Sequence, residues 1–385
     1  MKRLVILAMV AMLVMGSVAG TSLAGPAEEK VMVLSLDEAI DYALEHNSNI
    51  QLNKVSLDEA EKDFNQANDL KEKIADNPDS PYFPPGLSTA QQEELYPTFA
   101  ERGYEFAKVK LDYTKRSIRL SVESTYYNVL SAQKNVAVNQ ATHDRAAEQL
   151  KSAKAAFKAG TVAKNDVLGA EVQLDKATVD LNTAENDLDI AYMELNRAMG
   201  LELDQTLELT AKLDYASMEE IDVAEFIDQA SDADIGLIAA RIDYENKQDA
   251  FELTADYYTP NVYTYKDAKF ATAKSEVNFQ EAQKDFELKV MKSYKRLKQA
   301  EANYKMLLKS VDRAKENLRL AELRYEVGVA TSIEVLQASE MLNSQELYLS
   351  QALQGYNLLK AQFKHQVFIG SGAAASAGAG QASGM

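Results

Sequence analysis

Two stretches of this chain carry the same heptad pattern of apolar residues, in which steps of three and four residues alternate. The first series begins at Val167 and the second at Val335, 168 residues later. A 3.5-residue apolar period forms a stripe that a helix buries by winding around another helix. Its duplication predicts an all-α, internally repeated coiled-coil protein. The two series are Val167, Ala170, Leu174, Ala177, Leu181, Ala184, Leu188, Ala191, Leu195, Ala198, and Val335, Ala338, Leu342, Gln345, Leu349, Ala352, Tyr356, Leu359, Phe363.

A long helix without proline precedes each heptad series. The two predicted helices cover about residues 104–159 and 266–327, which at 1.5 Å per residue gives rods of roughly 85 and 90 Å. A tight turn follows each rod. Gly160 and Gly328 fit the position just after a helix, where a positive φ costs glycine least. Rods of this length are more typical of a tube than of a globular domain.

A short opening segment also occurs in both repeats. In SLDEAIDYALEHNSNI (35–50), Ser35 and Glu38 have capping-box spacing and predict a short amphipathic helix. A related segment lies at 223–237. These features divide the chain into a signal peptide (1–24), a first helical repeat (35–200, tip turn near 159–166), a second repeat (201–369, tip turn near 327–334) and a disordered tail rich in Gly, Ala and Ser (370–385).

The N-terminus has the pattern of an export signal. Lys2 and Arg3 precede a continuously apolar stretch, and small residues follow it. The apolar stretch is shorter than the roughly 20 residues that a membrane-spanning helix needs. We therefore expect an exported protein that works in the cell envelope.

Composition excludes several classes of function. A net charge of −18 argues against nucleic-acid binding, which requires a basic surface. The chain has no cysteine, and its three histidines, His46, His143 and His365, are far apart in sequence, so we expect no metal site and no cofactor. Carboxylates are numerous, but no nucleophile or base accompanies them in a recognisable motif, and we expect no enzymatic activity.

The opening segment, the turns AGTVAKNDVLGA and VGVATSIEVLQA, and the heptad helices after them resemble the TolC-type outer-membrane efflux family. The resemblance extends over about residues 35–368. It implies duplicated long-helix hairpins of the TolC α-barrel type, and three protomers that close into a helical tunnel. It also implies a periplasmic-type adaptor (a membrane fusion protein) and an inner-membrane pump as partners. By family analogy the tunnel belongs to the outer membrane.

The same resemblance assigns roles to residues around the two turns. Tip turns that face the adaptor are Ala159, Gly160 and Thr161 in the first repeat, and Val327, Gly328 and Val329 in the second. Candidate pore-entrance acids are Asp166 and Glu334, and candidate gate aromatics are Phe157 and Tyr325. Two simpler interpretations remain open: the acids cap the helices that they begin, and the glycines only end the rods.

The connectors opposite the tip turns depart from the family pattern. A transmembrane β-barrel strand needs about 9–11 residues alternating between apolar and polar, and each repeat must supply two. Residues 75–103 are rich in proline without such alternation, and residues 254–266 hold one short strand at most. We therefore expect a barrel-less member whose transmembrane strands are largely or wholly absent. Its contact with a membrane would be peripheral at most, or made through an atypical barrel end.

Aromatic residues gather in both connectors. They predict either a small cap packed over the helix ends or a belt at a membrane interface. The set is Tyr82, Phe83, Tyr96, Phe99, Tyr257, Tyr258, Tyr263 and Tyr265.

Two functions are compatible with these features. The first is a homotrimeric efflux duct coupled to an adaptor and a pump. The second is a secreted structural or adhesive coiled coil of the cell envelope, which kept the fold without transport. The missing strands favour the second, whereas the duplicated rods and tip turns favour the first. Oligomeric state distinguishes them, because a duct needs closure by symmetry.

Overall fold

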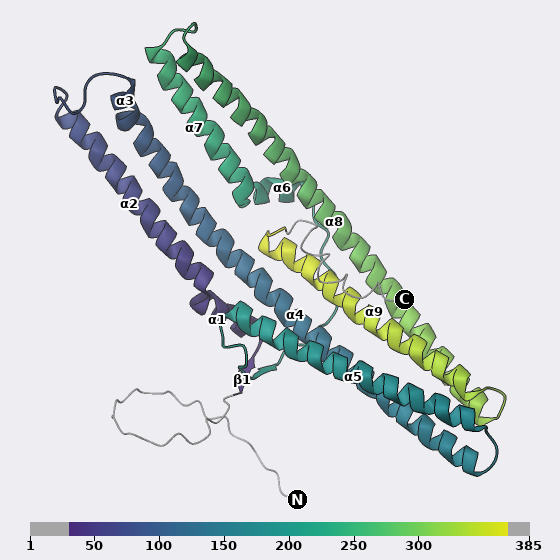
Figure 1. Ribbon diagram of the computed structural model, residues 1–385. Helices are drawn as coiled ribbons and strands as arrows, with labels where there is room; N and C mark the ends of the chain where they lie inside the picture. Colours follow the sequence, from purple (N-terminus) through teal and green to yellow (C-terminus); the bar gives the residue numbers. More distant parts are fainter. Residues whose placement is uncertain (1–30, 369–385) are drawn as a thin grey trace, which may run out of the picture.

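The computed structural model describes residues 31–368 as an elongated arrangement of helices (Figure 1). The predicted signal peptide (1–24) and tail (370–385) lie outside the described residues. The first repeat contains β1 (Met32–Leu34), α1 (Leu36–His46), α2 (Ser48–Asp76), α3 (Leu87–Ala90), the π-helical turn η1 (Gln91–Leu95), α4 (Tyr96–Lys158) and α5 (Lys164–Met199). The second contains β2 (Leu207–Leu209), α6 (Val223–Ser231), α7 (Ile235–Tyr257), α8 (Tyr263–Glu326) and α9 (Ser332–His365).

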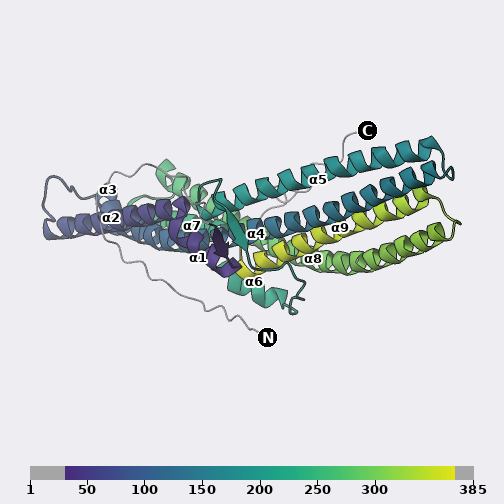
Figure 2. The same cartoon turned by 90° about the horizontal axis from the view of Figure 1, so that it is seen from below.

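Helices α4 and α8 run through both halves of the molecule, and shorter helices pack beside them in each half (Figures 1 and 2). Toward the tip turns, α4 contacts α5 and α9, and α9 contacts α8, so the order across the layer is α5, α4, α9, α8. Toward the connectors, α2 packs on α4, α4 on α7, and α7 on α8. This arrangement confirms the predicted fold of duplicated long-helix hairpins.

The first long helix begins earlier than the sequence predicted. Helix α4 has 63 residues and starts at Tyr96, although Pro97 had placed this segment in the connector. Pro97 lies in the first turn of α4, directly after the π-helical turn η1, and this locally wider turn accommodates a residue that has no N–H to donate. Helix α8 has 64 residues and starts at Tyr263, close to the predicted residue 266. Both rods end at the predicted tip turns and are about 95 Å long.

The heptad stripe of the first repeat is buried against α4. Leu195 and Ala191 of α5 pack with Val122, Tyr126 and Val129 of α4, and Leu195, Val122, Tyr126 and Val129 are fully buried. The Tyr126 hydroxyl donates to the Leu34 carbonyl at 3.0 Å and accepts from the Ala211 N–H at 3.2 Å. One buried tyrosine therefore ties β1 and the chain after β2 to the long helix.

The second stripe is buried in the same way. Val335 and Leu342 of α9 pack with Val311, Ala314 and Leu318 of α8. The heptad pattern thus correctly identified the helix pair within each repeat.

The short helix of each opening segment ends earlier than predicted, and a longer helix begins within the same segment. The Ser35 capping box is present, with the Ser35 N–H donating to a Glu38 carboxylate oxygen at 2.8 Å. Asn47 then ends α1 and begins α2, because its Oδ1 accepts from the Asn49 N–H at 2.9 Å. In the second copy the break falls at Asp234, whose Oδ1 accepts from the N–H groups of Gly236 and Leu237.

The described residues contain only two strands, β1 and β2, which form a short parallel pair with Leu34 beside Leu209. Residues 77–86 and 258–262, which join α2 to α3 and α7 to α8, contain turns and no strand. The prediction that the family's connector strands are largely or wholly absent is confirmed for the described residues. The single short strand allowed for 254–266 is not formed, since α7 continues to Tyr257. None of the described helices is both long enough and apolar enough to cross a membrane.

The aromatic residues of the connectors do not form the predicted cap within one chain. Phe99 packs against Leu95 and Leu253, which joins the start of α4 to α7. In contrast, Tyr82 is 87% exposed and Tyr263 is 82% exposed. Tyr82 lies in the turn after α2 and Tyr263 is the first residue of α8, and both side chains are exposed to solvent in the single chain.

Candidate functional site

Both tip turns are built from the same backbone hydrogen bonds. The Thr161 N–H donates to the Ala156 carbonyl at 3.0 Å, and the Val329 N–H donates to the Arg324 carbonyl at 2.9 Å. Gly160 and Gly328 have φ values of 77° and 74°, as their positions predicted. A Cβ on either glycine would meet nothing within 4 Å, so backbone conformation rather than space requires glycine here.

The two acids after the turns cap their helices. An Asp166 carboxylate oxygen accepts from the Ala163 N–H at 2.9 Å, and a Glu334 oxygen accepts from the Thr331 N–H at 3.2 Å. Glu334 also forms a 3.6 Å ion pair with Arg324, across the turn. The capping role is therefore present at both tips, where it fits the positive end of the helix dipole. It does not exclude a second role at a pore entrance.

The candidate gate aromatics occupy the last turn of each rod. Phe157 is 46% exposed and Tyr325 is 38% exposed. At the second tip Val327 and Val329 are more exposed still. The two tips lie at the same end of the molecule (Figures 1 and 2), so the predicted tip residues are brought to one end. This end presents half-exposed apolar side chains beside the capping acids.

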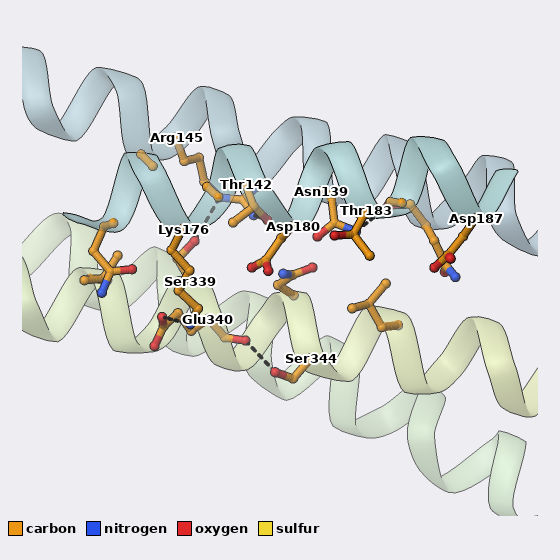
Figure 3. A pocket seen from close by; sticks show the side chains of 18 of the residues that line it. Asn139, Thr142, Arg145, Lys176, Asp180, Thr183, Asp187, Ser339, Glu340 and Ser344 are labelled. Atoms are coloured by element: carbon orange, nitrogen blue, oxygen red, sulfur yellow. Dashed lines mark hydrogen bonds and ion pairs between the residues drawn. The ribbon is translucent and has the colours of Figure 1, made fainter. Parts of the chain in front are cut away.

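A polar groove of about 390 Å³ lies between α4, α5 and α9 (Figure 3). Lys176 of α5 and Glu340 of α9 form an ion pair across it at 3.0 Å. Arg145 of α4 donates to the Ser339 hydroxyl of α9 at 2.9 Å. Because α5 and α9 reach one another over α4, this face of the helix layer is concave.

The sequence contains a polar pattern that marks this groove, and it lies beside the more prominent apolar pattern. On α5 a second series with steps of three and four residues runs beside the heptad stripe, and it is entirely polar. Its members all line the groove: Gln173, Lys176, Asp180, Thr183 and Asp187. This series marks one continuous polar face of α5.

A buried ionic cluster joins α4 to α9 nearer the middle of the molecule. Glu123 and His365 are 4% and 8% exposed, and a carboxylate oxygen lies 2.7 Å from His365 Nε2. Tyr127 donates to Glu123 at 2.8 Å, and the Lys364 ammonium lies 3.4 Å away. Burial alone would raise the pKa of Glu123, but the hydrogen bonds from His365 and Tyr127 hold that pKa below its usual value.

The outer helices of the layer, α5 and α8, have unpartnered apolar faces in the single chain. Val172 and Val179 of α5 are 64% and 62% exposed. At 100° per residue, they lie on the face of α5 opposite its buried heptad stripe. Exposed residues of the same type continue along both edges: Leu168, Ile190 and Met193 on α5, and Leu288, Met291, Met306, Leu320 and Leu323 on α8.

These features match the fold of a class of solved structures, the helical channels of the outer membrane. The fold matches the outer membrane protein VceC of Vibrio cholerae with a TM-score of 0.62 and 15% identity, covering 86% of this chain and 96% of that one. It matches the outer membrane channel CmeC of Campylobacter jejuni with a TM-score of 0.65 and 11% identity, covering 87% and 86%. At these identities the likeness establishes the fold.

Sequence comparison also finds relatives among the outer membrane efflux proteins. Residues 98–201 match the family model described as outer membrane efflux protein. Outer membrane protein TolC of Vibrio cholerae is 26% identical over 314 residues, which is 70% of this chain and 71% of that protein. TolC of Escherichia coli is 23% identical over 165 residues, 43% of this chain and 33% of that protein. The resemblance to the TolC-type outer-membrane efflux family is confirmed.

Proposed function

We propose that the chain is one protomer of a homotrimeric helical duct for efflux. The observation that carries this proposal is the pair of apolar free edges on α5 and α8. A curved layer of four helices with two unpartnered edges becomes a closed ring when the α5 edge of one copy meets the α8 edge of the next. Three copies with four helices each give the twelve-helix tunnel that the family resemblance implies.

In such a ring the polar groove faces the lumen. The groove occupies the concave side of the layer, and the apolar edges lie beside it where neighbouring copies meet. Its mixture of amides, hydroxyls and charges suits a water-filled passage, since such groups remain hydrated there. This arrangement assigns the polar series of α5 to the wall of the duct.

The tip turns supply the contact with an adaptor, which connects the duct to an inner-membrane pump. Val327 and Val329 offer exposed apolar surface at the end of a rigid hairpin, a surface suited to packing against another helical hairpin. Three copies each of Asp166 and Glu334 near the entrance would favour cations, because rings of carboxylates select for positive charge. Phe157 and Tyr325 lie before the turns and would narrow the entrance. The duct would work in the cell envelope after export, without acting as an enzyme.

Oligomeric state tests the proposal. We expect light scattering on a sizing column to give the mass of a trimer, and negative-stain images to show hollow rods. Val179→Lys places a charge on the α5 edge and should yield monomers. Glu185→Lys is the matched control, because this exposed residue of α5 lies on the convex face, about 120° away from Val179.

A stable monomer at high concentration would contradict the duct. The missing connector strands would then favour the alternative, a structural or adhesive coiled coil of the envelope. Disruption of the trimer by both lysine variants would show that the α5 edge is not the specific interface.

A further inference from the structure

The two connectors opposite the tip turns share an unusual composition. Residues 80–92 and 257–265 contain no Asp, Glu, Lys or Arg, in a chain that is 26% charged. Residues 257–265 include four tyrosines among nine residues, whereas aromatic residues make up 8% of the chain. The two segments have unrelated sequences, and yet both are uncharged and aromatic. We call residues 80–86 and 257–265 together the connector end.

The connector end is exposed in the structure and lies at one end of the molecule (Figure 1). Tyr82 and Tyr263 are almost fully exposed, and Tyr257, Tyr258 and Val262 are exposed to a lesser degree. Charged residues stop at its border, with Asp79 before the first segment and Asp256 before the second. Apolar rings therefore face outward where the two connectors turn.

The backbone of these turns exposes few hydrogen-bond donors. Pro81, Pro84, Pro85 and Pro260 lack an N–H. The Phe83 N–H donates to the Ser80 carbonyl at 3.0 Å, and the Val262 N–H donates to the Thr259 carbonyl at 3.1 Å. A turn with satisfied or absent donors loses little when it leaves bulk water.

Tyrosine is suited to the boundary between lipid headgroups and acyl chains, because its ring is apolar and its hydroxyl reaches water. No charged group within residues 80–86 or 257–265 would have to be desolvated there, because the nearest ones, Asp79, Asp256 and Lys266, lie at the borders of these segments. A specific protein partner requires a defined arrangement of side chains, whereas a lipid interface requires only this chemistry. Two unrelated sequences with the same chemistry therefore favour the lipid interface.

We propose that the connector end is a lipid-binding surface, which inserts its tyrosines shallowly into the interface of a bilayer without crossing it. The net charge of −18 makes neutral or zwitterionic headgroups the preferred surface. The inference rests on the connectors of one chain and stands apart from the trimer, although a trimer would place six connectors in one ring. Three copies would raise the binding strength by avidity.

The chain contains no tryptophan, so a single tyrosine-to-tryptophan change provides a selective fluorescent probe. We would introduce Tyr82→Trp and Tyr263→Trp separately into the full chain, with Tyr325→Trp at the tip as a matched control. Each variant would be mixed with phosphatidylcholine vesicles carrying bromine at shallow or deep acyl positions. We expect a blue shift and quenching by shallow bromine for both connector probes, and neither effect for the tip probe.

A second measurement tests the energetic role of the rings. The double variant Tyr82→Ser, Tyr263→Ser should reduce partitioning onto the same vesicles about tenfold or more. High salt should leave the binding of the unmodified protein unchanged, because no cation in the connectors pairs with a headgroup. A Val179→Lys chain should still show quenching at the connector probes, even if its trimer is lost.

The absence of both a blue shift and quenching at the connector probes would overturn the proposal. A protein partner would then be the better interpretation of this surface. Equal quenching of the tip probe would also overturn it, since lipid contact would not be confined to the connector end. Neither result bears on the trimer, which is measured separately.

Discussion

Helix α4 packs against α5 on one side and against α9 on the other, and these two interfaces, which we call seams, differ in chemistry. Against α5, within its own repeat, α4 packs through buried aliphatic and aromatic side chains such as Leu195 and Tyr126. Against α9, in the other repeat, much of the contact is polar, with Ser131 hydrogen-bonded to Ser350 and Asn128 to Gln354. A small apolar cluster around Leu120 adds to that seam near the middle of the molecule.

This difference separates the stability that a helix interface provides from the specificity with which it aligns the helices. Apolar seams gain stability in proportion to the area that they bury, and tolerate small shifts. Hydrogen-bonded seams add less net stability, but they cost free energy when a partner is displaced. Each hairpin is therefore expected to behave as one firm unit, while the seam between repeats fixes how the two units are aligned.

The largest expected effect comes from opening an apolar seam. Leu195→Ala removes a fully buried side chain of the α4/α5 pair and should lower the free energy of unfolding by about 3 kcal/mol. Urea unfolding followed by circular dichroism measures the change. Leu203→Ala is the control, because Leu203 is 54% exposed and its loss should cost less than about 0.5 kcal/mol. Equal costs for the two variants would contradict the assignment of this core.

The buried cluster of the polar seam should come next. Glu123→Gln weakens the contacts to His365 and Lys364 and should cost about 2 kcal/mol at pH 7. The folded-state pKa of Glu123 is lowered, so its stabilisation is complete above the unfolded value near 4.3 and is lost as pH falls through the folded value. Unfolding measured at pH 7 and in acid should therefore show the two proteins converging. A constant difference across pH would exclude the carboxylate as the source.

A smaller effect isolates a neutral hydrogen bond of the same seam. Ser131→Ala and Ser350→Ala, made singly and together, should give a coupling energy of about 1 kcal/mol. The double variant should be more stable than the sum of the single losses predicts, because no buried hydroxyl is left unpaired. Additive losses would mean that the two hydroxyls do not depend on one another.

The tip turns, which belong to neither seam, should give the smallest change. Gly160→Ala forces a side chain into a positive φ and should cost about 1 kcal/mol. Gly169→Ala is a control with the opposite sign, since Gly169 lies within α5 and alanine there should stabilise the helix by roughly 0.8 kcal/mol. Thermal unfolding of both variants tests the comparison. Destabilisation by both would show that the turn conformation is not what requires glycine.

The hairpins could be predicted because their signal is local and repeated. The apolar series of α5 and α9 identified the buried face of each helix, and Gly160 and Gly328 identified the turns. The seam between repeats could not be predicted in the same way. Ser131 and Ser350 are 219 residues apart, and serine on a long helix is ordinarily solvated. Only the three-dimensional alignment of α4 with α9 brings these polar residues together.

The same distinction between local patterns and contacts of distant residues applies to the candidate site. The turn glycines were predicted from their position just after the rods, and capping by Asp166 and Glu334 was one of two interpretations left open by their position at the start of a helix. The groove was missed, because its wall combines three helices from both repeats. The start of the first rod was placed too late because Pro97 was assigned to the connector. Proline is compatible with both a connector and a first helical turn, so its presence does not locate the start of the helix.

Among the helices of residues 31–368, only α4 and α8 continue from one half of the molecule to the other, and both do so without a break. The other long helices, α2, α5, α7 and α9, each occupy one half and have one end near the middle of the molecule (Figure 1). A twist applied at the tip turns would therefore reach the connectors through bending or rotation of α4 and α8. Near the mid-length of α4, its Tyr126 side chain is hydrogen-bonded to β1 and to the chain after β2. A displacement of α4 would therefore also have to move β1 and the chain after β2, which the Tyr126 hydroxyl holds.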